Sequence, residues 1–91
     1  MTRVLVHGAG RMARRVAAVL ADFEGMELVG MVSRSAKVDD SGIEYFASLD
    51  DCETRVDLLI DFTLPGGTAD AASWCAAKGV ALVSGTTGLT A

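Results

Sequence analysis

A glycine-rich segment near the N-terminus carries the first residues that could bind a ligand. It reads Gly8-Ala-Gly10-Arg-Met-Ala13, a GxGxxA pattern between a short apolar run and an amphipathic one. In that context Gly8 permits a tight turn, Gly10 lets the backbone approach a pyrophosphate, and Ala13 lets a helix pack closely on a strand. The free N–H groups of a helix N-terminus favour an anion there. The alternative is a glycine turn without a ligand, but both flanking elements favour dinucleotide binding.

The residues that follow the second predicted strand bear on which dinucleotide is bound. An NAD-preferring domain usually places an acid there, about twenty residues after the glycine motif, to bind the ribose 2′-hydroxyl. This sequence has Ser33 and then Arg34. A hydroxyl beside a guanidinium accepts a 2′-phosphate that a carboxylate would repel. The alternative for Arg34 is the start of a surface loop, and Arg11 either reaches the same phosphate or faces solvent.

Other reactive side chains favour structural roles. His7 is the only histidine, and because it closes a strand beneath the expected cofactor we expect it to support the site rather than to catalyse. Trp74 is expected in the core. Cys52 and Cys75 lack CxxC spacing and are expected to be reduced, buried thiols. With so few ligands, we expect no metal site.

Composition narrows the partners. The formal net charge of −4 opposes attraction to nucleic acid or an acidic membrane surface. We find neither an apolar run of about 18 residues nor a signal-peptide layout, so the sequence predicts a cytoplasmic protein.

Hydrophobic periodicity predicts alternating strands and helices. Strands are expected at 3–7, 27–32, 43–47, 56–62 and 80–83, and a brief helical turn after a capping box at Ser48 and Asp51. A helix stripe of large apolar residues is expected to face the core, and it comprises Met12, Val16, Val19, Leu20 and Phe23. A break at 65–67 precedes an alanine-rich helix that stops at 78–79. The pattern predicts one α/β domain over residues 1–91, a Rossmann-like doubly wound parallel sheet whose ligand segments share one rim.

Several motifs together resemble a known family. They are Gly8-Ala-Gly10-Arg11-Met12, Asp61-Phe62-Thr63 followed by Pro65 and Thr68, Trp74-Cys75, and Gly85-Thr86-Thr87-Gly88. In this order they resemble the N-terminus of the dihydrodipicolinate (4-hydroxy-tetrahydrodipicolinate) reductase family, which serves lysine and diaminopimelate biosynthesis. The resemblance covers nearly the whole chain.

The resemblance implies a homotetrameric oxidoreductase that transfers hydride from NADPH or NADH to a cyclic imine dicarboxylate. It assigns the pyrophosphate to Gly8, Gly10, Arg11 and Met12, and the adenosine phosphate to Arg34. It places Phe62 and Thr63 beside the cofactor. It assigns the nicotinamide to Gly85, Thr86 and Thr87, of which Thr86 and Thr87 would also contact substrate.

The sequence departs from the family in two ways. Its glycine motif is one residue shorter than the common family form and ends in Ala13. The family's histidine-rich catalytic segment and its substrate loop lie beyond residue 91, so no catalytic residue is assigned here. We therefore expect the 91 residues alone to be inactive and to bind the dicarboxylate only with the missing domain. The alternative is a stand-alone, non-catalytic dinucleotide-binding or redox-sensing module.

Overall fold

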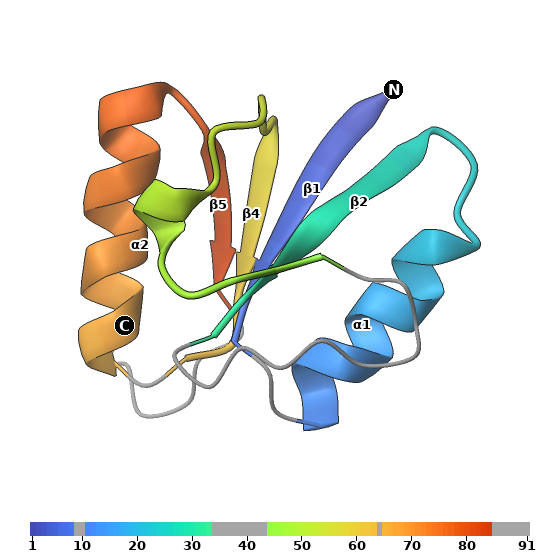
Figure 1. The fold of residues 1–91 in the computed structure, drawn as a ribbon, viewed down its shortest axis with the longest axis horizontal. Coiled ribbons are helices and arrows are strands. Elements are labelled where there is room, and N and C mark those ends of the chain that lie inside the picture. Colours follow the sequence, from blue (N-terminus) through green and yellow to red (C-terminus); the bar gives the residue numbers. More distant parts are fainter. Residues whose placement is uncertain (9–10, 34–43, 64, 85–91) are drawn as a thin grey trace.

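The chain forms a five-stranded parallel sheet in the order β3-β2-β1-β4-β5, with helices on both faces (Figure 1). The computed structural model describes residues 1–8, 11–33, 44–63 and 65–84. The strands are β1 (Thr2–His7), β2 (Met26–Val32), β3 (Tyr45–Phe46), β4 (Leu58–Asp61) and β5 (Ala81–Ser84). The helical elements are α1 (Arg11–Ala21), the 3-10 turn η1 (Leu49–Asp51) and α2 (Pro65–Lys78). The predicted Rossmann-like fold is confirmed.

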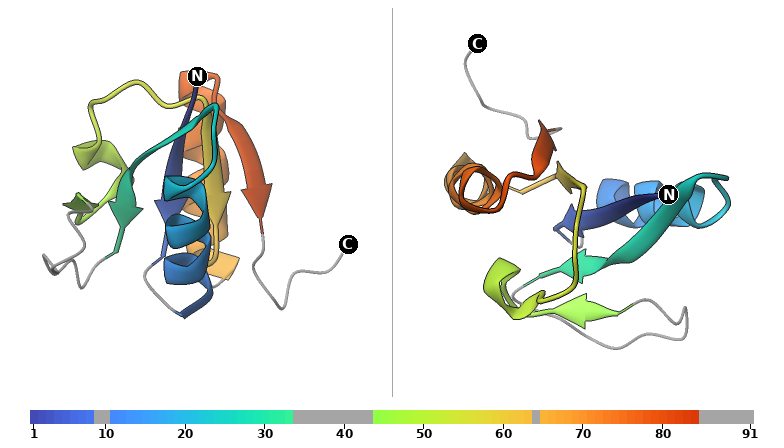
Figure 2. Two further views of the ribbon diagram at one scale, coloured as in Figure 1. Left: turned by 90° about the vertical axis from the view of Figure 1, so that its right-hand side faces the viewer. Right: turned by 90° about the horizontal axis from the view of Figure 1, so that it is seen from above.

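The sheet separates two hydrophobic clusters. Val4, Leu5 and Val6 of β1 are completely buried, as expected for a central parallel strand covered on both faces. Leu5 belongs to the cluster with Trp74 and Cys75 of α2, whereas its two neighbours belong to the cluster with α1. Figure 2 shows α1 on one face of the sheet, with α2 and η1 on the other.

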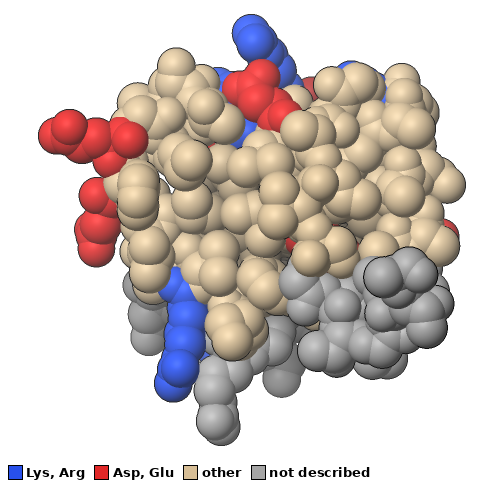
Figure 3. All heavy atoms as spheres, turned by 180° about the vertical axis from the view of Figure 1, so that it is seen from behind, with Lys and Arg blue, Asp and Glu red and all other residues tan. Residues whose placement is uncertain are grey.

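The buried face of α1 differs from the predicted stripe. Ala13, Ala17 and Leu20 are buried against the sheet, and their spacing of four and three residues defines the inner face of the helix. Because alanine is small, the helix backbone can approach the strands closely. The prediction was wrong for three large side chains, since Met12, Val19 and Phe23 are 58%, 57% and 58% exposed. Consistent with such exposed apolar side chains, the face seen in Figure 3 is largely uncharged, with its charged side chains mainly near the margins.

The predictions for the start of α2 and for the turn after Ser48 are only partly correct. The predicted break at 65–67 was wrong in extent, because α2 begins at Pro65, where proline's missing N–H is not needed by the helix. The turn after Ser48 forms, but the Ser48 side chain makes no capping hydrogen bond.

Cys52 and Cys75 are confirmed as free, buried thiols, and burial raises the pKa of both. Trp74 is confirmed in the core, with 7% of its surface exposed.

Four strands end level at one edge of the sheet. His7 pairs with Val32 on one side and with Asp61 on the other, and Asp61 pairs in turn with Ser84. These are the last residues of β2, β1, β4 and β5, so their carboxyl ends meet at the lower edge in Figure 1. In open α/β sheets, ligands bind outside this edge. The single rim expected from the order of elements is confirmed for the described residues.

Neither a membrane-spanning helix nor a cluster of metal ligands occurs in the described ranges. Within residues 1–8, 11–33, 44–63 and 65–84, no helix is long and apolar enough to cross a membrane. The same ranges hold no group of three or more His, Cys, Asp or Glu side chains placed to bind a metal ion.

Gly30 of β2 should be required for packing of the edge strand β3. A Cβ atom at Gly30 would lie 2.6 Å from the Glu44 carbonyl oxygen and 2.8 Å from Phe46 Cε2. We expect Gly30→Ala to lower the free energy of unfolding by about 1–3 kcal/mol, because a backbone carbonyl must move. Urea denaturation would measure this. Ala81→Val, at an exposed position of β5, is the control and should change stability by less than about 0.5 kcal/mol; equal effects of the two variants would refute the packing argument.

Candidate functional site

The turn between β1 and α1 brings backbone close to backbone at the sheet edge. Gly8 has a φ of +119°, which residues with side chains rarely adopt. Its N–H donates to the Val32 carbonyl at 2.7 Å, and the Phe62 N–H donates to the His7 carbonyl at 2.9 Å. A Cβ atom on Gly8 would lie 3.4 Å from the Phe62 carbonyl oxygen. Glycine is therefore needed for the conformation, whereas a Cβ atom at this position would meet the Phe62 carbonyl at an ordinary van der Waals distance.

The N-terminus of α1 lies directly after this turn and suits an anion. The helix begins at Arg11, and its first turn contains no acidic residue. Unpaired N–H groups and the helix dipole give such an end a partial positive charge. The edge therefore combines a tight glycine turn with a helix N-terminus whose first turn contains no acidic residue.

Beneath the same edge lies a fully buried carboxylate, that of Asp61, the last residue of β4. Oδ1 accepts hydrogen bonds from the Thr63 hydroxyl at 2.7 Å and from the Thr63 N–H at 3.4 Å. Oδ2 accepts one from the Thr68 hydroxyl at 2.5 Å. An ionised carboxylate only accepts hydrogen bonds, so these donors suit its charged form. Because Thr68 lies in the first turn of α2, the carboxylate ties the end of β4 to the start of that helix.

Gly67 makes room for this arrangement. A Cβ atom there would overlap the Thr63 hydroxyl and lie 2.7 Å from Thr63 Cβ. The glycine therefore lets the Thr63 side chain sit under the first turn of α2, where it reaches Asp61.

His7 faces the same carboxylate from β1. Its Nδ1 lies 3.0 Å from Asp61 Oδ1, but the two atoms do not form a hydrogen bond of good geometry. The contact is therefore chiefly electrostatic. Burial lowers the pKa of His7 below its ordinary value of 6.5, and the charges of Asp61 and Asp70 oppose that shift. The lowered pKa favours the neutral imidazole near pH 7, and the supporting role of His7 at this edge stays a prediction.

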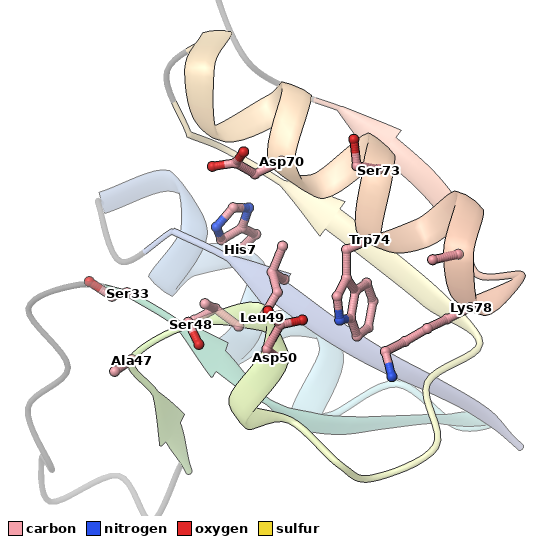
Figure 4. A pocket seen from close by; sticks show the side chains of 12 residues that line it. His7, Ser33, Ala47, Ser48, Leu49, Asp50, Asp70, Ser73, Trp74 and Lys78 are labelled. Atoms are coloured by element: carbon pink, nitrogen blue, oxygen red, sulfur yellow. The ribbon is translucent and has the colours of Figure 1, made fainter.

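A groove runs from this edge along α2. It has a volume of about 530 Å³ and lies between α2 on one side and β2, the segment 47–48 and η1 on the other (Figure 4). We call it the α2 groove; it is lined by His7, Val32, Ser33, Ala47, Ser48, Leu49, Asp50, Asp70, Ser73, Trp74, Ala77 and Lys78. His7, Ser33 and Asp70 lie toward one end in Figure 4, and Trp74 and Lys78 toward the other.

The Trp74 end of the groove holds a buried donor and a cation. The indole Nε1 is buried and has no hydrogen-bond partner among the residues that the structure describes. The Lys78 ammonium lies 5.6 Å from the centre of the indole ring, within range of a cation–π interaction. Because a buried, unpaired donor is unfavourable, an acceptor inside the groove would be favoured at this end.

The predicted site residues fall into two groups. Gly8, Met12, Phe62 and Thr63 lie at or beside the carboxyl edge of the sheet, and the backbone of Arg11 starts α1 there. The side chain of Arg11 lies outside what the structure describes, as do the residues Gly10, Arg34, Gly85, Thr86 and Thr87. Ser33 and Ser84 are described and flank two of those segments, so the chain enters both at this edge.

Sequence reasoning missed Asp61 as the centre of the site. The sequence shows Asp61 as part of the Asp61-Phe62-Thr63 motif but assigns it no role. The available signal was an acid at a strand end followed by threonines two and seven residues later. The first is within reach in a turn, and the second comes within reach only when the helix starts at Pro65.

Sequence comparisons identify relatives of this chain. The family model described as "Dihydrodipicolinate reductase, N-terminus" matches residues 2–91. A 4-hydroxy-tetrahydrodipicolinate reductase of Xanthomonas euvesicatoria pv. vesicatoria is 41% identical, over 96% of this chain and 38% of the relative. One from an Anaeromyxobacter species is 37% identical, over 99% of this chain and 38% of the relative. The chain thus spans about two fifths of their length.

A solved structure supports the fold. The diaminopimelate (DAP) dehydrogenase of C. glutamicum, solved in complex with DAP, aligns with a TM-score of 0.75 and 26% identity, over 96% of this chain and 28% of that one. Because the family model covers almost every residue, the chain belongs to the dihydrodipicolinate reductase family, of which it represents the N-terminal, dinucleotide-binding part.

Proposed function

We propose that residues 1–91 act as one domain that binds NADPH or NADH for a cytoplasmic 4-hydroxy-tetrahydrodipicolinate reductase. The observation that carries the proposal is the Gly8 turn, which has a φ of +119° and follows the end of β1, three positions before α1 begins at Arg11. The pyrophosphate would lie against Gly8, Gly10, Arg11 and Met12, where backbone N–H groups and the helix dipole favour its charge.

The adenosine end of the dinucleotide would enter the α2 groove. Ser33 lines the groove at the end of β2, and no acid stands at this position to repel a 2′-phosphate. Arg34 follows and would pair with that phosphate. A guanidinium suits this role because it binds a phosphate by charge-assisted hydrogen bonds.

The nicotinamide end would lie over β4 and β5. Phe62 and Thr63 follow β4 directly. Thr63 donates two hydrogen bonds to the Asp61 carboxylate, and the Phe62 N–H donates to the His7 carbonyl. The segment with Gly85, Thr86 and Thr87 follows β5, and its hydroxyls suit a carboxamide and an edge of the substrate. When bound, the reduced nicotinamide supplies the hydride. The remainder of a family polypeptide would hold the cyclic imine dicarboxylate, supply the proton and complete a homotetramer.

Dinucleotide binding should depend on Gly10. We expect Gly10→Val to weaken NADPH and NADH at least tenfold, because a branched side chain would occupy the place of the pyrophosphate. Isothermal titration calorimetry on the 91-residue chain would measure both dissociation constants. Ala76→Val, at an exposed position of α2, is the control. Equal binding by the wild type and a folded Gly10→Val variant would show that the pyrophosphate site is misplaced.

Cofactor preference should depend on Arg34. A charge-assisted contact with a phosphate contributes about 1.5–3 kcal/mol, so we expect Arg34→Ala to weaken NADPH about ten- to hundredfold and NADH far less. Ser33→Asp should shift preference toward NADH. The measurement is the ratio of the two dissociation constants at fixed ionic strength. Equal weakening of both cofactors by Arg34→Ala would assign the phosphate to another residue.

Turnover should require the rest of a family polypeptide. We expect the 91-residue chain to bind cofactor without oxidising NADPH in the presence of the dicarboxylate substrate. The reason is that we propose the proton donor and the substrate site to lie in the remainder of a family polypeptide. Joining the chain to the C-terminal part of a relative should restore activity. Substrate-dependent NADPH oxidation by the pure chain would contradict this division of roles, and binding without restored activity would favour a stand-alone module.

A further inference from the structure

We propose that His7 is a proton-coupled phosphate-binding residue, which takes up a proton from solvent when a dinucleotide phosphate binds and then pairs with that phosphate through its groove-facing edge. The inference deepens the proposed function and rests on it. It assigns to His7 a contact with the ligand in addition to its support of the edge.

The orientation of the His7 ring leaves one of its edges open to a ligand. Nδ1 is buried and lies 3.0 Å from the Asp61 carboxylate, which fixes which edge of the imidazole turns inward. The ring nevertheless lines the α2 groove, and 14% of the side chain is exposed. The edge opposite Nδ1, which carries Nε2, is therefore the one available to a ligand. A proton on Nε2 would give this edge a charged donor.

His7 also lies next to both segments that are proposed to bind a phosphate. It directly precedes the Gly8 turn, and its register partner Val32 directly precedes Ser33. Both dinucleotide phosphates of the proposed binding mode, the pyrophosphate at the turn and the 2′-phosphate at Ser33, would therefore approach the end of β1. The shared chemistry is a phosphate oxygen, and either phosphate could supply it.

The charges around the ring make protonation responsive to such a ligand. Asp61 faces His7 from β4 and Asp70 from α2, and both favour the imidazolium, whereas burial disfavours it and leaves the pKa lowered. Asp50 of η1 and Lys78 of α2 line the same groove. A phosphate would add negative charge on the side of the ring away from Asp61, and would thereby raise the pKa of His7 on binding.

The expected rise in the pKa of His7 on binding sets the direction in which affinity changes with pH. A group that binds a proton more tightly in the complex than in the free protein strengthens binding as pH falls between the two pKa values. The free chain holds His7 neutral above its ordinary pKa of 6.5. Binding at neutral pH should therefore consume protons, and affinity should increase toward pH 6.

The test compares NAD⁺ and NADP⁺ binding to wild type and His7→Gln between pH 8 and pH 6. Fluorescence of Trp74, the one tryptophan and a groove residue, provides the signal. Calorimetry in buffers of different ionisation enthalpy counts the protons. We expect wild-type affinity to rise about five- to tenfold and His7→Gln affinity to change less than twofold beyond any titration of the ligand itself, since one proton gives at most tenfold per pH unit. Glutamine keeps an amide donor toward Asp61 but does not titrate.

The two ligands distinguish the two phosphates. A difference between wild type and His7→Gln with both ligands assigns the contact to the pyrophosphate, and one with NADP⁺ alone assigns it to the 2′-phosphate. The 2′-phosphate itself titrates with a pKa of about 6. This titration is the same with wild type and His7→Gln, so it cancels in the comparison. Should His7→Gln fail to fold, Asp70→Asn, at an exposed position, should shift the wild-type pH dependence to lower pH. Equal pH dependence and equal proton uptake in wild type and variants would overturn the inference. Absence of any binding would instead refute the proposed function.

Discussion

The buried carboxylate of Asp61 is the interaction on which the described edge depends. An isolated charge without exposure to water is costly by several kcal/mol, so it persists only where donors surround it. Here the donors are the hydroxyls of Thr63 and Thr68, with His7 on the remaining side. Each comes from a different segment: the turn after β4, the first turn of α2, and the end of β1. One carboxylate thus fixes three pieces of backbone relative to one another.

This anchor acts together with the level ends of the strands. Parallel pairing of β2, β1, β4 and β5 brings four chain segments to one edge, but pairing alone leaves the turns after each strand undetermined. At β1 the turn is set by the positive φ of Gly8 and its hydrogen bond to Val32. At β4 it is set by Asp61. The two turns are joined through the Phe62 N–H, which donates to the His7 carbonyl, so a change at either turn would be transmitted to the other.

The proposed function assigns binding and chemistry to different parts of a family member. A cofactor that carries its own reactive hydride would require only orientation from this domain. Backbone N–H groups, the Gly8 turn and the edge held by Asp61 would provide that orientation. The exposed side chains of Val19 and Phe23 show that the described surface is apolar in places away from this edge.

The sequence by itself determined the order of strands and helices, the parallel sheet and the glycine turn, because period, length and glycine spacing are local signals. It also determined the burial of Trp74 and of both cysteines. Only the tertiary structure decided which face of α1 is inward: the small Ala13 and Ala17 permit the closest approach to the sheet, while larger neighbours such as Val19 remain outside. It alone gave Asp61 its role, since Thr68 reaches the carboxylate only once α2 starts at Pro65 and Gly67 admits Thr63 beneath it. Contacts between segments far apart in the chain leave no periodic pattern in the sequence. The contact of His7 with Asp61, which lie in different strands, is therefore visible only in the tertiary structure.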